Sequence, residues 1–78
     1  MKIKITKPDS ILYEGDAKLV QLPGTDGSLE ILESHAPIIS SLAVGTIRIV
    51  TPDNAEQTFG IRGGVVKGQQ NVLSILVQ

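Results

Sequence analysis

Turn-forming residues recur at short intervals along this chain and limit how long any regular element can be. Glycine accepts positive φ angles and proline fixes φ at about −65°, so clusters of these residues with Asp, Asn or Ser end helices and strands. Five such clusters occur in 78 residues, at positions 8–10, 23–27, 52–54, 63–64 and 68–71. This spacing predicts short strands joined by tight turns.

The segments between these turns carry aliphatic residues at alternate positions, which is the period of a half-buried strand. We expect strands over residues 2–6, 17–22, 28–32, 46–51, 57–62 and 72–78. Helical spacing never persists beyond one turn; residues 36–44 come nearest, and their Ile-Ile-Ser-Ser-Leu order fits a strand as well. Residues 72–77 are almost continuously apolar, which predicts a strand buried on both faces or one that faces a partner. The predicted fold class is all-β, a sandwich or barrel.

Composition argues against nucleic-acid and membrane-spanning functions. The net charge is −1 and Tyr13 and Phe59 are the only aromatic residues, whereas nucleic-acid binding uses a basic face with aromatic platforms. Lys2, Lys4 and Lys7 alternate with isoleucines, as on one solvated face of a strand. No segment approaches the roughly 18 apolar residues of a spanning helix, and the first residues do not resemble a secretory signal. We therefore expect a protein that faces the cytosol.

His35 is the only histidine and the first candidate for catalysis. Acid–base or nucleophilic chemistry needs a group that orients the imidazole or a nucleophile that it activates. Ser34, Ser40 and Ser41 are close in sequence, but no Gly-x-Ser-x-Gly turn presents any of them. We interpret His35 as a structural or interface residue.

Metal and phosphate sites have equally little support. With no cysteine, a metal would depend on carboxylates such as Asp26, Glu30 and Glu33, whose spacing is not that of an EF-hand loop. Residues 24–27 lack the Gly-Lys-Ser/Thr ending of a P-loop, and residues 60–64 lack the third glycine of a dinucleotide fingerprint. We interpret both glycine pairs as turns, with 63–64 as a tight reversal or bulge.

The residues by themselves therefore indicate a small, aliphatic β-domain that binds another protein. Two alternatives remain open at this point. One is a small β-barrel that binds nucleic acid, and the other is a minimal hydrolase that uses His35.

Several motifs together resemble the N-terminal domain of the epsilon subunit of F-type ATP synthases. Each motif is weak alone, but their order and spacing cover nearly the whole chain. The motifs are Tyr13-Glu14-Gly15, the segment 17–27 with its Pro-Gly-Thr-Asp-Gly turn, Ser34-His35-Ala36-Pro37, Gly45-Thr46-Ile47-Arg48-Ile49, Gly63-Gly64-Val65-Val66 and Asn71-Val72-Leu73-Ser74-Ile75-Leu76.

The resemblance implies a flattened β-sandwich of about ten short, mostly antiparallel strands, forming a single domain over residues 1–78. In that family the domain lies at the foot of the central stalk, between the gamma subunit and the polar loops of the membrane c-ring. It passes the proton-driven rotation of the ring to the gamma subunit. The resemblance therefore implies a non-catalytic rotor subunit with no cofactor, peripheral at the cytoplasmic face of a bacterial cell membrane.

The resemblance also assigns partner-binding residues by position. Those that would face gamma are His35, Ala36, Pro37, Ile38 and Ser40. Those that would face the c-ring loops are Asp26, Gly27, Ser28, Leu29 and Glu30, with Glu33 close by.

The ring-facing segment departs from the family pattern. Ser28 stands where many relatives have an acidic residue, and Glu30 stands where a glycine is common. Glu33-Ser34 replaces Pro-Gly. The loop is thus more acidic than usual, and we expect Asp26 or Glu30 to pair with a basic ring residue.

Most relatives continue into a C-terminal helical hairpin, whereas this sequence stops at Gln78. We expect a short form, natural or truncated, and assign it neither the nucleotide binding nor the inhibition associated with that hairpin.

Overall fold

The computed structural model describes residues 1–78 and consists of nine short strands. They are β1 (Lys2–Lys7), β2 (Ser10–Asp16), β3 (Leu19–Gly24), β4 (Gly27–Leu32), β5 (Ile38–Leu42), β6 (Gly45–Val50), β7 (Glu56–Ile61), β8 (Gly64–Gln69) and β9 (Val72–Val77). The all-β prediction is confirmed, and each of the six strands expected from alternation is present. β2, β5 and β8 are additional, and β5 replaces the nearest candidate helix. No helix is long and apolar enough to cross a membrane.

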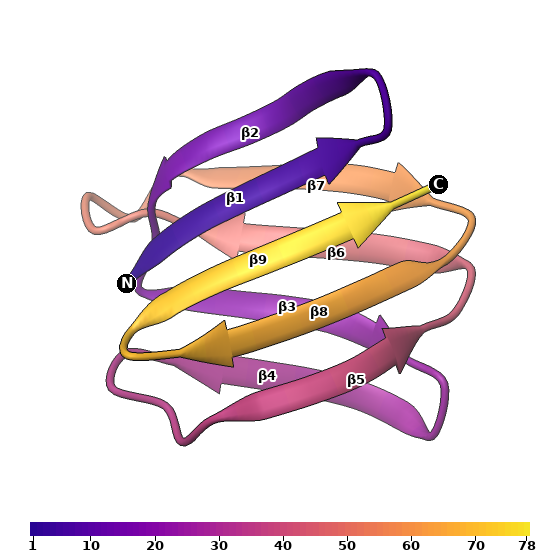
Figure 1. Ribbon diagram of the computed structural model, residues 1–78. Coiled ribbons are helices and arrows are strands. Elements are labelled where there is room, and N and C mark those ends of the chain that lie inside the picture. Colours follow the sequence, from indigo (N-terminus) through magenta and orange to yellow (C-terminus); the bar gives the residue numbers. More distant parts are fainter.

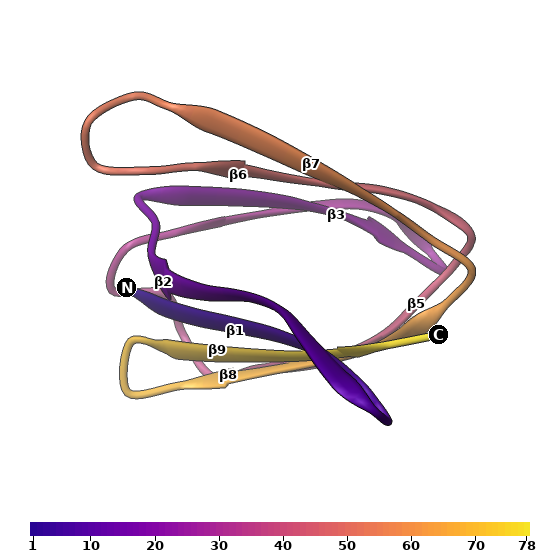
Figure 2. The ribbon, with the colours of Figure 1, turned by 90° about the horizontal axis from the view of Figure 1, so that it is seen from above.

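The strands form two layers, as Figures 1 and 2 show. One layer has the order β2-β1-β9-β8-β5, and the other has the order β4-β3-β6-β7. A single residue pair, Gly24 with Leu42, joins the layers in the ladder at the β3–β5 edge. All neighbours are antiparallel except β1 and β9, which run parallel. The expected flattened sandwich of mostly antiparallel strands is thus confirmed.

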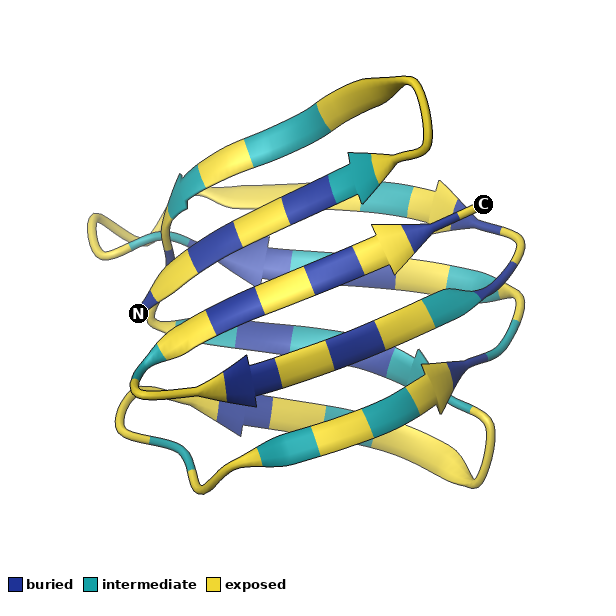
Figure 3. Cartoon of the chain, in the orientation of Figure 1, coloured by how far each residue is buried: buried dark blue, intermediate teal, exposed yellow.

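Aliphatic side chains from both layers meet in one core, and buried residues alternate with exposed ones along the strands (Figure 3). In β9, Leu73, Ile75 and Val77 are fully buried, whereas Val72 and Leu76 are about half exposed. Of the two expectations for this strand, burial on both faces is wrong, because its outer face has no covering layer; that it faces a partner stays a prediction. Burial of each such aliphatic side chain contributes about 1.5–3 kcal/mol, and these side chains hold the two layers together.

The turns that connect the strands use the residues that the sequence marked. Gln70 and Asn71 both have positive φ, 53° and 60°, which is the backbone of a type I′ hairpin. Gly63 and Gly64 form the expected reversal, carrying the chain from β7 in one layer to β8 in the other. A Cβ at Gly64 would lie 2.2 Å from the carbonyl oxygen of Leu76, so this approach requires glycine.

Candidate partner-binding surfaces

The loop between β4 and β5 holds His35 against the neighbouring strand β8. A Cβ added at Gly68 would lie 2.7 Å from Cε1 of the imidazole, so the ring packs where β8 has no side chain. Nδ1 lies 2.9 Å from the carbonyl oxygen of Ala36, its only hydrogen-bond partner, and Nε2 is buried without one. No carboxylate orients the ring and no hydroxyl lies within its reach. The ring therefore packs against β8, and its role at an interface stays a prediction.

The residues expected to meet gamma do not share one surface. Ile38 is half buried and packs against the core, and Ser40 is half buried on the same side of β5. Pro37 is exposed at the start of this strand. Ile39, which the sequence reasoning passed over, is 74% exposed. The alternation of side chains along a strand could have found it, because an inward Ile38 and Leu42 send Ile39 outward.

Ile39 belongs to a larger surface on the outside of its layer, which we call the apolar–basic face. Val65 of β8 lies directly opposite Leu76 of β9, and both are exposed. Lys67 lies opposite Ile39 on the next strand. The face comprises Ile39, Val65, Val72, Leu76, Lys2, Lys4 and Lys67. At its β2 edge, Asp16 lies opposite Lys2 and Glu14 lies opposite Lys4, with which it forms an ion pair at 3.9 Å, so Lys67 is the lysine of the face without an acidic neighbour across the strand.

The β3–β4 turn forms an acidic tip at one end of the sandwich. Asp26 and Gly27 are exposed at this tip, and Ser28 follows on the outer side of β4. Two backbone hydrogen bonds fix the tip against the end of β5 and the residue that follows it: Thr25 N donates to Ser41 O at 3.1 Å, and Ala43 N donates to Pro23 O at 2.7 Å. The acidic turn is therefore a fixed part of the fold.

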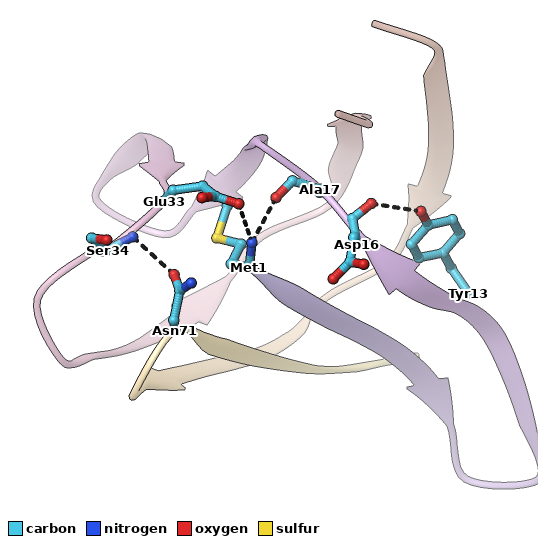
Figure 4. A network of polar contacts seen from close by, with 7 residues as sticks. All are labelled: Met1, Tyr13, Asp16, Ala17, Glu33, Ser34 and Asn71. Carbon is cyan, nitrogen blue, oxygen red and sulfur yellow. Dashed lines mark hydrogen bonds and ion pairs between the residues drawn. The ribbon is translucent and has the colours of Figure 1, made fainter. Parts of the chain in front are cut away.

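The remaining ring-facing candidates are spread over the structure. Leu29 points inward and packs against the core. Glu33 follows the opposite end of β4, roughly 20 Å from the turn given the rise of an extended strand. Its carboxylate binds the buried amine of Met1, which also donates to Ala17 O at 3.0 Å (Figure 4). Glu33 thus has a partner within its own chain.

The segment after Glu33 is tied down in the same region. Ser34 adopts a positive φ of 59°, and its N–H donates to the Asn71 side-chain oxygen at 2.8 Å (Figure 4). This contact anchors the His35 loop to the β8–β9 turn.

A row of polar side chains crosses the outer face of the other layer, and we call it the polar row. Gln21 of β3 lies directly opposite Glu30 of β4 and Arg48 of β6. Arg48 Nη1 donates to Gln21 Oε1 at 3.0 Å, and Gln21 Nε2 donates to Glu30 Oε2 at 2.9 Å. Arg48 Nε donates to Glu56 of β7. The row borders a shallow groove that is also lined by Pro23, Ser28, Thr46 and Thr58.

Comparison with known proteins places this geometry in a family. A family model for the β-sandwich domain of the ATP synthase delta/epsilon chain matches residues 1–78. The chain belongs to this family. The resemblance drawn from the motifs is thereby confirmed.

Curated relatives from several bacteria agree with the delta/epsilon assignment. The ATP synthase epsilon chain of Campylobacter lari is 36% identical over 78 residues, covering 100% of this chain and 60% of the relative. That of Rippkaea orientalis is 35% identical over 77 residues, covering 99% of this chain and 56% of the relative. That of Rickettsia typhi is 34% identical over 80 residues, covering 100% and 73%. The chain spans little more than half the length of the first two.

Solved structures share the delta/epsilon fold at low sequence identity. A chain of the Euglena gracilis mitochondrial ATP synthase (OSCP/F1/c-ring, rotational state 1) matches with a TM-score of 0.90 at 17% identity, over 96% of this chain and 48% of that one. A chain of the Tetrahymena thermophila mitochondrial ATP synthase central stalk/c-ring matches with a TM-score of 0.82 at 20% identity, over 100% of this chain and 63% of that one. The fold is thus shared with these chains although few residues are identical.

Proposed function

We propose that this chain is a non-catalytic central-stalk component of an F-type ATP synthase, coupling the proton-driven c-ring to the gamma subunit. The observation that carries the proposal is the presence of two different surfaces on one sandwich. The apolar–basic face covers the outside of one layer, and the acidic turn with the polar row belongs to the other. A part that transmits torque needs two separate attachment surfaces joined by a packed core. Family membership supports this proposal.

Gamma, in this proposal, binds the His35 loop, β5 and the adjoining apolar–basic face. Exposed apolar side chains gather there without a covering layer, with Ile39 74% and Leu76 52% exposed. Exposed apolar groups gathered on one face, interspersed with polar ones, are typical of protein interfaces. Ala36 and Pro37 contact gamma directly, whereas His35, Ile38 and Ser40 hold the loop and strand in place.

The polar loops of the c-ring, in this proposal, meet the acidic turn. Asp26, Gly27, Ser28 and Glu30 are exposed and provide the contact. Leu29 anchors the turn from the core side. Glu33, which the resemblance also assigns to the ring, lies at the other end of β4 and binds the Met1 amine there. The chain then lies peripherally at the cytoplasmic face of a bacterial inner membrane, held there by the complex.

The gamma contact is tested with two substitutions of equal chemistry. Ile39→Asp places a charge at the centre of the proposed interface, and Leu32→Asp places one on the outer side of β4 in the other layer, where Leu32 is 53% exposed. Calorimetric titration against purified gamma from the same source should show a one-to-one complex that Ile39→Asp weakens at least tenfold. Desolvating an unpaired carboxylate costs at least the roughly 1.4 kcal/mol that tenfold represents.

Leu32→Asp should leave the affinity unchanged. Equal effects of the two substitutions would reject this face as the gamma surface. Absence of any complex with the folded wild-type chain would reject the central-stalk proposal itself. Ile39 suits the test better than Ile38, whose replacement would also disturb the core.

A further inference from the structure

The orientation of the Gln21 amide is decided by its neighbour in the polar row. A guanidinium has donors and no acceptor, so the amide must present its oxygen to Arg48. The observed contact, Arg48 Nη1 to Gln21 Oε1 at 3.0 Å, has this sense. The amide nitrogen is then left pointing toward β4, where it donates to Glu30 Oε2 at 2.9 Å. Arg48 therefore determines the hydrogen bond that Glu30 receives.

Arg48 is itself held in place from the other side. Its Nε donates to Glu56, so the guanidinium uses two donors of its planar fork in two directions at once. A lysine ammonium in this position has no such fixed fork. The charge of Glu56 also offsets that of Arg48, which leaves Glu30 as the unbalanced charge of the row.

The row has a consequence for any partner that binds Glu30. A glutamate on an exposed edge strand samples many rotamers, and binding must restrict them at a cost in entropy. Here Gln21 already restricts the carboxylate, and only one of its oxygens is engaged by this bond. The other oxygen remains available to a cation.

We propose that Gln21 and Arg48 are positioning residues, which hold the Glu30 carboxylate in the orientation that receives a basic side chain of the c-ring loops. This inference rests on the proposed function and adds to it the residues that prepare the ring contact. Gln21 lies on β3 and Arg48 on β6, so neither belongs to the acidic turn.

The test uses the variant Arg48→Leu, for which a charge effect and a positioning effect predict opposite changes in affinity for the c-ring. If Arg48 acted only through its charge, Arg48→Leu would strengthen binding to a basic loop, because a repelling cation is removed. If Arg48 positions Glu30, the same change weakens binding. We would measure binding of the chain, in complex with gamma, to the detergent-solubilised c-ring of the same source at low salt.

We expect Glu30→Gln and Arg48→Leu each to weaken binding about two- to fivefold, as for the loss of one exposed charge pair. Arg48→Lys should weaken it similarly, since it keeps the charge and loses the fork. The double variant of Glu30 and Arg48 should bind no more weakly than Glu30→Gln alone. Thr58→Val, opposite Arg48 in the same groove, should have no effect.

Each failure has a separate meaning. If Glu30→Gln weakens binding but Arg48→Leu strengthens it or leaves it unchanged, the positioning role is refuted and the ring contact stands. If Glu30→Gln has no effect, the ring contact through Glu30 is refuted together with the inference.

A readout without the ring completes the test. In the chain alone, Arg48→Leu should shift the NMR signals of the Gln21 side-chain amide and the Glu30 carboxyl carbon, and Thr58→Val should not. Unshifted signals in Arg48→Leu would refute the coupling within the row.

Discussion

Replacement of Gly64 by alanine should destabilise this domain strongly. The added Cβ would lie 2.2 Å from the carbonyl oxygen of Leu76 and 3.0 Å from Cα of Val77, both backbone atoms of β9. They cannot move aside without breaking the β8–β9 ladder. Overpacking costs about 1–3 kcal/mol, and a φ of 158° adds about 1–3 kcal/mol for a residue with a side chain. We expect the free energy of unfolding to fall by about 2–6 kcal/mol.

Two nearby glycines separate the clash from the backbone strain. Gly63 has a φ of 154°, but the nearest atom to its Cβ would be Leu42 O at 3.4 Å, an ordinary contact. Gly63→Ala should therefore be destabilised by the backbone strain alone, which costs about 1–3 kcal/mol of unfolding free energy. At Gly60 nothing lies within 4 Å of an added Cβ and φ is ordinary, so Gly60→Ala should change stability by less than about 0.5 kcal/mol.

Urea unfolding followed by circular dichroism would measure the series. A domain of this size has a free energy of unfolding of about 4–12 kcal/mol, so Gly64→Ala should fall near or below the folding threshold. In thermal unfolding, each kcal/mol lowers Tm by about 4–8 °C. A Gly64→Ala variant as stable as Gly60→Ala would refute the reasoning, because it would show that the β7–β8 crossing tolerates a side chain.

Three further substitutions test contacts elsewhere. Glu33→Gln removes the charge that binds the buried Met1 amine and should cost about 1 kcal/mol in urea unfolding; an unchanged midpoint would show that this ion pair contributes nothing. Gly68→Ala brings a methyl within 2.7 Å of the imidazole and should shift its NMR resonances while costing about 1–3 kcal/mol. The Thr51 hydroxyl donates to Asp53 and, with backbone hydrogen bonds, lowers the pKa of that carboxyl. Because this pKa is lower in the folded state, its contribution is present above the unfolded pKa and is lost as pH falls through the folded one. Asp53→Asn should therefore reduce the loss of stability in acid, and a carboxyl-carbon NMR titration showing an ordinary Asp53 pKa would contradict this.

Alternation along the chain predicted strands well where one face is buried and the other is solvated. β1 and β9 follow that rule, with Ile3 and Ile5 inward in one and Ile75 inward in the other. Alternation did not predict β2, an edge strand. Its register shifts opposite Ile5 and Thr6, so its side chains follow no strict period of two. It failed for β8 because two of its inward positions, Gly64 and Gly68, have no side chain to mark them.

The candidate surfaces were predictable only in part, since a position in the sequence does not say which way a side chain points. The His35 loop and the acidic turn lie at separate parts of the fold, whereas Glu33 lies beside the His35 loop, and the assignment of each segment to a partner stays a prediction. Ile39 was missed because it is adjacent to residues that face inward. The polar row was missed because Gln21, Arg48 and Glu30 become neighbours only through the pairing of β3 with both β4 and β6.

The parallel pairing of β1 with β9 bears on how this protein is made. Residues 2–6 are synthesised early but pair in register with residues 72–76, which emerge from the ribosome about seventy residues later. Until then β1 has only its hairpin partner β2, and an isolated two-stranded hairpin is marginal in water. Closing so distant a contact is slow compared with local turns. The nascent chain therefore exposes Ile3 and Ile5 until β9 is available, and the sandwich can close only after β9 is complete.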